Sequence, residues 1–247
     1  MNSRLLLSMT RKAVDEYRMI EEGDRIAVGL SGGKDSLTLL YGLKGLQTFY
    51  PKHFELCAIT VDLGFKNLDF GKIEALCEEL SIPLTIARTT IGEVVFEDRQ
   101  EKNPCALCAK LRKGALNRHA LELNCNKIAY AHHKDDIIET MYMSLIFEGR
   151  IHTFSPVTYL DRSKLTVIRP LMFLTEPEIL SFRNQMSLPV VKNPCPADGN
   201  TKREWAKQSL ASLEREFPGT KSRLFTAILN GHMEGWPERV TRRRGSN

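Results

Sequence analysis

The sequence predicts an α/β protein with a mainly parallel five-stranded sheet flanked by helices, and with further helices at the N- and C-terminal ends. Two observations lead to this prediction. Apolar runs typical of buried strands alternate with helix-length segments as far as about residue 150. Polar residues suited to binding or catalysis directly follow several of these runs. Strands separated by helices form right-handed βαβ units, and ligands bind beyond the carboxyl ends of their strands.

The elements follow in a regular order. Strands are predicted at 25–30, 55–61, 83–87 and 127–131, and helices at 3–20, 35–46, 69–80, 106–123 and 134–147. Gly149, Pro156 and Pro170 indicate an irregular segment over 148–170. A helix is predicted over 176–186 with Thr175 as its N-cap, and two closing helices at about 202–215 and 219–230. We therefore expect an N-terminal helix over 1–20, an α/β domain over 21–190, a C-terminal helical region over 191–240 and a frayed basic tail over 241–247.

Composition indicates a soluble cytoplasmic protein. Of the 247 residues, 42% are hydrophobic and 26% are charged, which is ordinary for a globular chain. No apolar run approaches the ~18 residues of a membrane span, and the N-terminus lacks the apolar core of a secretory signal. The six cysteines are therefore expected to be reduced, metal-bound or catalytic rather than disulfide-bonded.

The most informative segment joins the first strand to the following helix. We name it the phosphate loop; it consists of Ser31, Gly32, Gly33, Lys34, Asp35 and Ser36. Two glycines allow a sharp turn and a close approach of the backbone to a ligand. The helix start then offers free N–H groups and a positive dipole end, to which Lys34 adds a charge and the serines add hydroxyl donors. This combination predicts a pyrophosphate-binding site.

The phosphate loop differs from a Walker loop, because Lys34 precedes Asp35 and not a hydroxyl residue. The pattern S-G-G-x-D-S at a strand–helix junction instead resembles the PP-loop ATPases. These enzymes cleave ATP between the α- and β-phosphates, transfer AMP to a substrate oxygen and release pyrophosphate. The alternative is an ordinary Gly-Gly turn capped by Asp or Ser.

The cysteines form the second signal. Cys105 and Cys108 make a C-x-x-C pair, and Cys195 lies between two prolines, where packing alone does not demand a thiol. Structural zinc usually needs four ligands. Three thiolates suit an iron–sulfur cluster with one iron open to another ligand. Alternatively, Cys108 and Cys195 are a catalytic pair in which one carries a persulfide. The remaining cysteines are interpreted as small buried residues: Cys57, Cys77 and Cys125.

A third segment, from His132 to Asp136, opens a helix at another strand end. The adjacent carboxylates Asp135 and Asp136 suit Mg²⁺ or the orientation of a nucleotide, although aspartate is also common at helix starts. Metal ligation is one interpretation of His132 and His133, but no third histidine has suitable spacing, so for both we expect nucleotide contact or simple packing. Asp62, at the end of the second strand, falls at the same sheet edge. One active site built from separate loops is the prediction.

Basic residues gather in three places and indicate a polyanionic partner, although solvated helix faces are the alternative for each. The clusters are Arg112, Lys113 and Arg118; Lys202, Arg203 and Lys207; and Arg239, Arg242, Arg243 and Arg244.

In combination, the motifs SGGKDS, CALC followed by AKLRKG, AHHKDD, FEGR, VIRPL and the late PC resemble those of the tRNA-cytidine 2-sulfurtransferases, over roughly residues 22–225. The resemblance implies a PP-loop (adenine nucleotide alpha hydrolase-like) fold, tRNA as substrate and sulfur insertion at C2 of cytidine 32. A cysteine desulfurase or free sulfide would be the sulfur donor. A long substrate held by few basic patches also favours a homodimer. The chain departs from the family where Pro196 follows Cys195, since members often carry a second cysteine shortly afterwards.

Carried onto this chain, the resemblance implies that the phosphate loop binds ATP and that Cys105, Cys108 and Cys195 hold a [4Fe–4S] cluster. Asp136, with Asp135 beside it, would be catalytic or would bind Mg²⁺, and Arg112 occupies a position where related thiolases carry a basic residue. The base O2 would attack the α-phosphate, with Lys34 and Mg²⁺ stabilising the charge. Sulfide held at the open iron would then displace AMP.

Two other functions fit parts of the sequence. An adenylating ligase that attaches an amine would share the phosphate loop without needing three cysteines. A non-catalytic, nucleotide-binding redox regulator would bind ATP and release no pyrophosphate when given tRNA.

Overall fold

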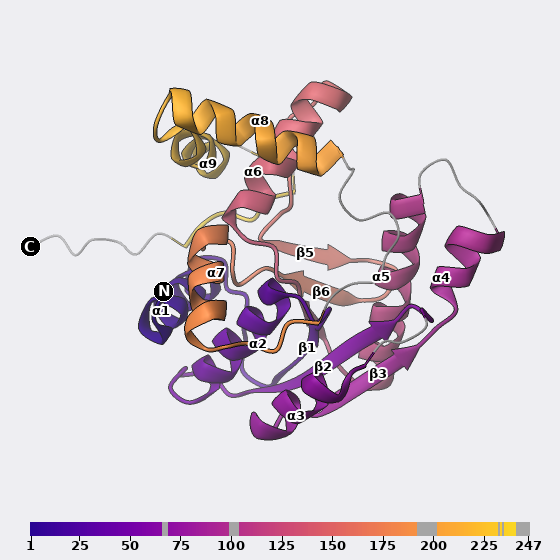
Figure 1. Cartoon of the computed structure of the whole chain (residues 1–247). Coiled ribbons are helices and arrows are strands. Elements are labelled where there is room, and N and C mark those ends of the chain that lie inside the picture. Colours follow the sequence, from indigo (N-terminus) through magenta and orange to yellow (C-terminus); the bar gives the residue numbers. More distant parts are fainter. Residues whose placement is uncertain (66–68, 99–103, 192–201, 232, 234, 241–247) are drawn as a thin grey trace, which may run out of the picture.

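The computed structural model describes residues 1–65, 69–98, 104–191, 202–231, 233 and 235–240. Within these residues the sheet has six strands in the order β3-β2-β1-β4-β6-β5 (Figure 1). Their bounds are β1 Asp24–Gly29, β2 Phe54–Asp62, β3 Leu84–Arg88, β4 Lys127–Ala129, β5 Val157–Leu160 and β6 Leu165–Ile168. Every neighbouring pair is parallel except β5 with β6. The mainly parallel α/β sheet is confirmed, with one strand more than expected.

The segment over 148–170, expected to be irregular, contains an antiparallel hairpin, so that expectation is wrong. Val157 pairs with Ile168 and Leu160 with Leu165, and β6 then continues the sheet beside β4. Each strand has only four residues, and the half-buried edge strand β5 mixes apolar with polar side chains. So short and mixed a pattern gives little periodicity, and the pairing with β4 supplies the stability that the local sequence lacks.

Helices cover both faces of the sheet. Their bounds are α1 Ser3–Glu16, α2 Lys34–Gln47, α3 Gly71–Glu79, α4 Ile91–Glu93, α5 Pro104–Glu122, α6 Lys134–Met143, α7 Glu176–Gln185, α8 Lys202–Glu216 and α9 Thr220–Asn230. The short α4 and the π-helical turn η1 (Val94–Asp98) were not predicted. The helix expected over 134–147 is formed by α6 as far as Met143. A second π-helical segment, η2 (Ser144–Glu148), continues directly from it.

The two faces of the sheet have separate cores because alternate strand residues point in opposite directions. Ile26 and Val28 of β1 pack in the larger core with side chains from α1, α2, α3 and α7. Ala27, between them in sequence, belongs to the smaller core on the face of α5, with Leu116 and Ala120. The helices therefore bury both faces, as a parallel sheet requires.

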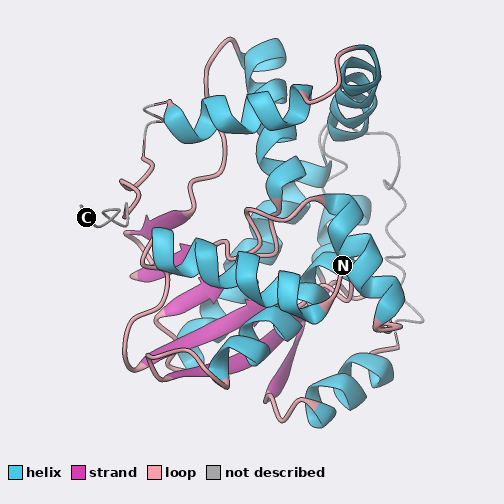
Figure 2. Ribbon diagram, turned by 90° about the vertical axis from the view of Figure 1, so that its left-hand side faces the viewer, coloured by secondary structure: helices cyan, strands magenta, loops and turns pink. Residues whose placement is uncertain are grey.

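Helices α6, α8 and α9 with η2 form a group beside the sheet, at the top of Figure 1. Figure 2 shows the same group above the strands after a quarter turn. Leu210 of α8 and Phe225 and Ile228 of α9 join the larger core, so the group is packed onto the domain. Cys195 and the tail over 241–247 lie outside the described residues. Among the described helices, none is long and apolar enough to cross a membrane.

Candidate active site

The phosphate loop follows β1 and ends in the first turn of α2. Gly32 has a φ of +78°, which favours glycine. A Cβ at Gly32 would lie 3.0 Å from Ile73 Cδ1 and 3.2 Å from Val191 Cβ, so the position also demands a residue without a side chain. Gly33 is the N-cap of α2, and no side chain caps the helix there. The N–H groups of the first turn therefore remain available for an anion.

The two loop serines hold the turn together. Ser36 Oγ accepts a hydrogen bond from Ser31 N–H at 3.2 Å and donates to Gly33 O at 3.0 Å. The two hydroxyl oxygens lie 3.2 Å apart, and Gly33 N–H donates to Ser31 Oγ at 3.3 Å. Ser36 is buried. Its hydroxyl therefore maintains the loop shape in this structure.

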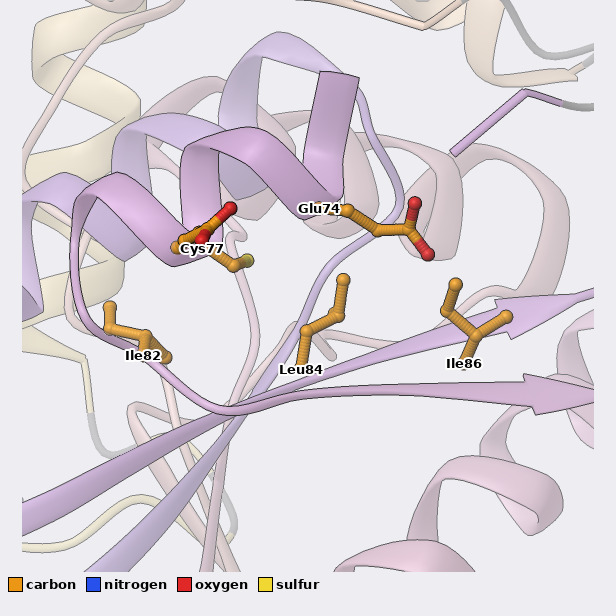
Figure 3. A pocket seen from close by; sticks show the side chains of 6 residues that line it. Glu74, Cys77, Ile82, Leu84 and Ile86 are labelled. Carbon is orange, nitrogen blue, oxygen red and sulfur yellow. The ribbon is translucent and has the colours of Figure 1, made fainter. Parts of the chain in front are cut away.

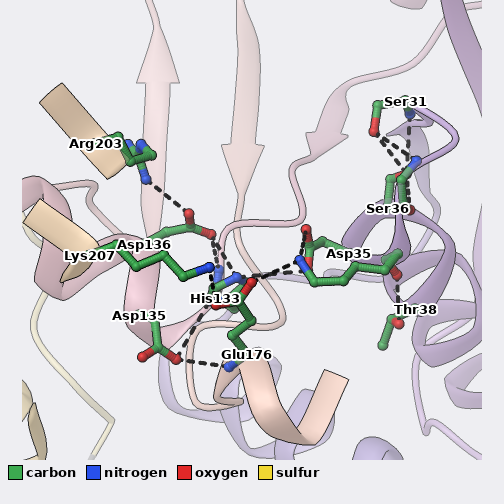
Figure 4. Close-up of polar contacts among 12 residues, drawn as sticks. Ser31, Asp35, Ser36, Thr38, His133, Asp135, Asp136, Glu176, Arg203 and Lys207 are labelled. Carbon is green, nitrogen blue, oxygen red and sulfur yellow. Dashed lines mark hydrogen bonds and ion pairs between the residues drawn. The ribbon is translucent and has the colours of Figure 1, made fainter. Parts of the chain in front are cut away.

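Lys34 lies in a network of charges that connects the phosphate loop to α7. Its ammonium lies 3.0 Å from Asp35 Oδ2 and 3.3 Å from Glu176 Oε1. Burial lowers the pKa of Lys34, but the Asp35 and Glu176 carboxylates outweigh that effect and raise it. Lys34 therefore stays charged, in a position suited to a phosphate. Figure 4 shows the two acidic residues, Asp35 and Glu176, together with His133.

Asp135 and Asp136 lie in the first turn of α6 and have different surroundings. Asp135 accepts hydrogen bonds from Lys221 Nζ at 2.9 Å and from Glu176 N–H at 2.8 Å. Burial raises the pKa of Asp135, but these two donors lower it below the ordinary value. Asp136 accepts from His133 N–H at 3.0 Å and from Arg203 Nη1 at 2.9 Å. Its side chain is 21% exposed and that of Asp135 only 5%, so Asp136 is the more accessible carboxylate.

The cations that meet these carboxylates come from α8 and α9, and Figure 4 shows those of α8, Arg203 and Lys207. Arg203 and Lys207 belong to a basic cluster that the sequence interpreted as either a contact for a polyanion or a solvated helix face, and both contact carboxylates of the site. Lys207 Nζ lies 2.7 Å from Glu176 Oε2. Burial raises the pKa of Glu176, but Lys207 and Lys34 lower it more strongly. Glu176 thus lies between two ammonium groups, one from α2 and one from α8.

His133, for which the sequence predicted nucleotide contact or simple packing, lies at the centre of the site. Its side chain is buried, with Nε2 3.4 Å from Asp136 Oδ2 and 3.7 Å from Asp35 Oδ1. The phosphate loop and the carboxylates of α6 therefore meet through one imidazole. His132, its neighbour, has a different partner: Nδ1 accepts a hydrogen bond from Arg169 Nε at 3.1 Å.

Glu139, one turn after Asp135 and Asp136, has a strongly perturbed pKa. Its side chain is buried, and Arg203 Nη1 lies 3.5 Å from its Oε2. Burial raises the pKa of Glu139 to about 7, and the Asp136 carboxylate adds to the shift while Arg203 opposes it. No sequence pattern singled out Glu139, because its shift depends on the packing of α8 against α6.

Cys105 and Cys108, which we call the thiolate side of the site, lie on α5. Cys105 and Cys108 occupy the first two turns of that helix, one exposed and the other buried. Cys195 cannot be placed beside them, because it lies outside the described residues. Among the residues that are described, no group of three or more His, Cys, Asp or Glu side chains is arranged to hold a metal.

Arg112 lies on the same helix, one turn after Cys108. The Arg112 charge opposes the burial that raises the pKa of Tyr130 to about 12. Tyr130 immediately follows β4, at the carboxyl edge of the sheet. Arg112 of α5 therefore places its positive charge where it acts on that edge.

Two further features have less to do with the site. Asp62 lies at the carboxyl end of β2 as predicted, but its carboxylate accepts from Gly64 N–H at 2.9 Å and so shapes the local turn. An open hollow of about 240 Å³ lies between α3 and β3, lined by Glu74, Cys77, Glu78, Ile82, Leu84 and Ile86 (Figure 3). None of the predicted site residues lines it. Cys57 and Cys125 are also buried away from the site, with their sulfurs 3.3 Å apart.

The geometry of the loop and sheet agrees with a comparison to known families. Residues 5–214 match the family model described as a PP-loop domain. Because that match covers most of the chain, the protein is a PP-loop protein.

More specific relatives narrow the family. The tRNA-cytidine(32) 2-sulfurtransferase of Pelobacter propionicus is 40% identical over 232 residues, which are 93% of this chain and 86% of that protein. The enzyme of the same name from Citrifermentans bemidjiense is 38% identical over 224 residues, or 90% of this chain and 88% of that protein. The chain belongs to the tRNA-cytidine(32) 2-sulfurtransferase family.

A solved structure also resembles the whole chain. It is the U34-tRNA thiolase NcsA from Methanococcus maripaludis with its [4Fe-4S] cluster. The TM-score is 0.73 at 26% identity, and the match covers 94% of this chain and 81% of that chain.

Proposed function

We propose that this protein is a tRNA sulfurtransferase that thiolates a tRNA base at the expense of ATP, with cytidine 32 as the target. The observation that carries the proposal is the meeting of the phosphate loop with the carboxylates of α6 through His133, whose Nε2 lies 3.7 Å from Asp35 and 3.4 Å from Asp136. The C-x-x-C pair lies at the start of α5, which packs on the face of the sheet opposite to α2. The names of the relatives supply the substrate class.

The residues suit adenylation. The uncapped N–H groups at the start of α2 and the ammonium of Lys34 would bind the phosphates of ATP. The base O2 would attack the α-phosphorus, which forms a P–O2 bond and breaks the bond to pyrophosphate. Sulfide would then add at C2, and the C2–O2 bond would break to release AMP. The positive charge of Lys34 would stabilise the charge that develops on the phosphate oxygens.

The thiols suit an iron–sulfur cluster. Cys105 and Cys108 lie three residues apart on one helix, and the exposed Cys105 leaves that turn open to a ligand. With Cys195 the donor set is three thiolates, which is one fewer than a closed structural zinc site needs. The family and the cluster of the NcsA structure support this assignment. When bound, a [4Fe–4S] cluster would supply the sulfide nucleophile.

For Mg²⁺ we propose Asp136 as the protein ligand. Its side chain is four times as exposed as that of Asp135, whose two oxygens are already occupied by Lys221 and the Glu176 N–H. Binding would require Arg203 to leave one oxygen of Asp136. We further propose a cytoplasmic location, a cysteine desulfurase or inorganic sulfide as the sulfur donor, and a homodimer that holds the long substrate.

Product analysis tests the proposal against its alternatives. With α-labelled ATP and a substrate tRNA, the expected products are AMP and pyrophosphate together with 2-thiocytidine. ADP and phosphate would contradict adenylation. AMP formation by a protein that carries neither iron nor labile sulfide would favour an adenylating ligase, and ATP binding without any pyrophosphate release would favour the regulator.

A further inference from the structure

Arg169, directly after β6, is a buried cation without a carboxylate partner. The residue is 8% exposed, and no carboxylate oxygen of the described residues lies within 4.0 Å of its guanidinium. Its partners are neutral: Nη1 donates to Ser155 O and to Thr158 Oγ1, and the guanidinium carbon lies 5.2 Å from the centre of the Phe154 ring. Buried charges are normally paired, so this arrangement needs a reason.

The remaining contact of Arg169 supplies that reason. Arg169 Nε donates to His132 Nδ1 at 3.1 Å. A guanidinium can only donate, so Nδ1 must be the acceptor and the single proton of the neutral imidazole must sit on Nε2. Burial, followed by the Arg169 charge, lowers the pKa of His132 to about 3. Arg169 therefore holds His132 as a neutral ring with one fixed N–H donor.

That donor is free to act on a ligand. His132 Nδ1 already accepts the hydrogen bond from Arg169. Nε2 has no hydrogen-bond partner among the described residues, and it is not one of the fully buried side-chain atoms that lack a partner. The ring stacks on Phe154 with centroids 4.1 Å apart and planes 20° apart, so its orientation is fixed. It follows the end of β4, four residues before Asp136, whose charge acts on it. The donor thus belongs to the edge of the sheet where the substrate base must reach ATP.

We infer that His132 Nε2–H reads the acceptor edge of the target base and selects cytosine over uracil, with Arg169 as the residue that positions it. The inference rests on the proposed function and names the residue that determines its base specificity. Cytosine presents two neighbouring acceptors, O2 and N3. Uracil presents a donor, N3–H, where cytosine has an acceptor. A histidine that can only donate therefore pairs with cytosine N3 and meets another donor in uracil.

The expected discrimination is large. A site built to hydrogen-bond one group rejects a substrate that lacks it, because a buried polar atom is then left unpaired. A residue that can both donate and accept at the same place would lose that discrimination. Glutamine is such a residue, since its side-chain amide carries both functions.

The test compares two tRNAs that differ only in having C32 or U32. In competition, the cluster-loaded wild-type protein should thiolate C32 in strong preference. His132→Gln should reduce the preference about tenfold or more, with ATP affinity unchanged. The ratio of the affinities of the metal-free protein for the two tRNAs should fall in parallel, which is a readout independent of the cluster. His53→Gln, an exposed histidine at the opposite sheet edge, is the matched control and should change neither ratio.

Arg169→Met separates positioning from a merely structural role. Without the guanidinium, His132 can place its proton on either nitrogen, so the C32 preference should fall. The pH below which the rate with C32 falls should also move upward, because one of the charges that opposes protonation of His132 is gone. Burial, Arg203 and His133 would still lower the pKa of His132, and Asp136 would still raise it. Arg162→Met, in the exposed β5–β6 turn, is the control.

The outcomes are distinct. An unchanged C32 preference in active His132→Gln protein overturns the inference and leaves the proposed function intact. So does a loss of ATP affinity without a change in preference, which would make His132 a nucleotide contact. A pH profile of Arg169→Met identical to that of the wild type overturns the positioning role. If the cluster-loaded wild-type protein thiolates neither tRNA, the proposed function itself fails and the inference fails with it.

Discussion

The nucleotide side and the thiolate side of this molecule are built differently. On the nucleotide side, Lys34, Glu176 and Lys207 form a continuous chain of ion pairs across three helices, and Asp135 is buried with its own partners. On the thiolate side, Cys105 and Cys108 come from one helix start, and the third thiol is 87 residues further along the chain than Cys108. Ion pairs between side chains thus organise the nucleotide side, whereas on the thiolate side we propose that a metal joins the three thiols.

The largest expected effect follows from this contrast. Serine at Cys105, Cys108 or Cys195 should abolish thiolation and remove about four irons per chain, the content of a [4Fe–4S] cluster. ATP affinity should stay within about twofold, because the nucleotide side does not depend on the metal. Iron and labile-sulfide analysis after anaerobic preparation, together with equilibrium ATP binding, measures both sides at once.

The other three cysteines provide the matched controls. Cys57, Cys77 and Cys125 are buried in the two cores, so serine there should retain iron and activity per folded molecule. Full activity of a metal-free or zinc-loaded preparation under anaerobic conditions would contradict the cluster and support the persulfide alternative.

The second effect tests the nucleotide side alone. Lys34→Met should slow pyrophosphate release by about 100-fold or more, the usual loss when one preorganised positive group is removed from a developing charge. Iron content should not change. Lys44→Met, near the other end of α2, is the control for the helix itself. An equal loss of iron in Lys34→Met would show that the two sides are coupled, which the ion pairs of the structure do not suggest.

The third effect is smaller and concerns the surface beside the thiols. Arg112→Ala with Lys113→Ala should weaken tRNA binding regardless of its sequence. The slope of log affinity against log salt should fall by about one for each phosphate that the variant no longer neutralises. Lys72→Ala, exposed on α3, should leave that slope unchanged. Unchanged affinity of the double variant at low salt would mean that both residues are simply solvated.

The sequence predicted the parts of the molecule that depend on local patterns. The phosphate loop and the first turn of α6 are contiguous stretches at strand ends, and the topology of a parallel sheet brings them together. The hairpin of β5 and β6 was missed because each strand has four residues and owes its stability to β4. The third cysteine was predicted from its chemistry, and it lies outside the described residues.

The ion-pair partners were beyond sequence reasoning for a physical reason. Glu176, Lys207 and Lys221 lie on α7, α8 and α9, and only the packing of these helices decides which charges meet. A basic residue looks the same in a sequence whether it faces RNA or a buried carboxylate. Arg203 illustrates this, since its cluster indicated a polyanion and its guanidinium contacts Asp136. The contacts that each side chain makes in the folded protein, not its residue type, separate the two roles.

The smallest effect concerns stability on the nucleotide side. The pKa of Glu139 is raised from 4.5 to about 7, chiefly by burial. The native state therefore holds a proton that the unfolded chain has released, and stability falls as the pH rises from about 4.5 through 7. Replacing the carboxyl by an amide removes this dependence. Glu139→Gln should have little effect near pH 4.5 and should raise the free energy of unfolding by about 2–3 kcal/mol at pH 8. Urea unfolding at several pH values measures it, with Glu78→Gln on the exposed side of α3 as control. A stabilisation that is the same at every pH would mean that Glu139 ionises normally, and that Arg203, 3.5 Å away, fully compensates its burial.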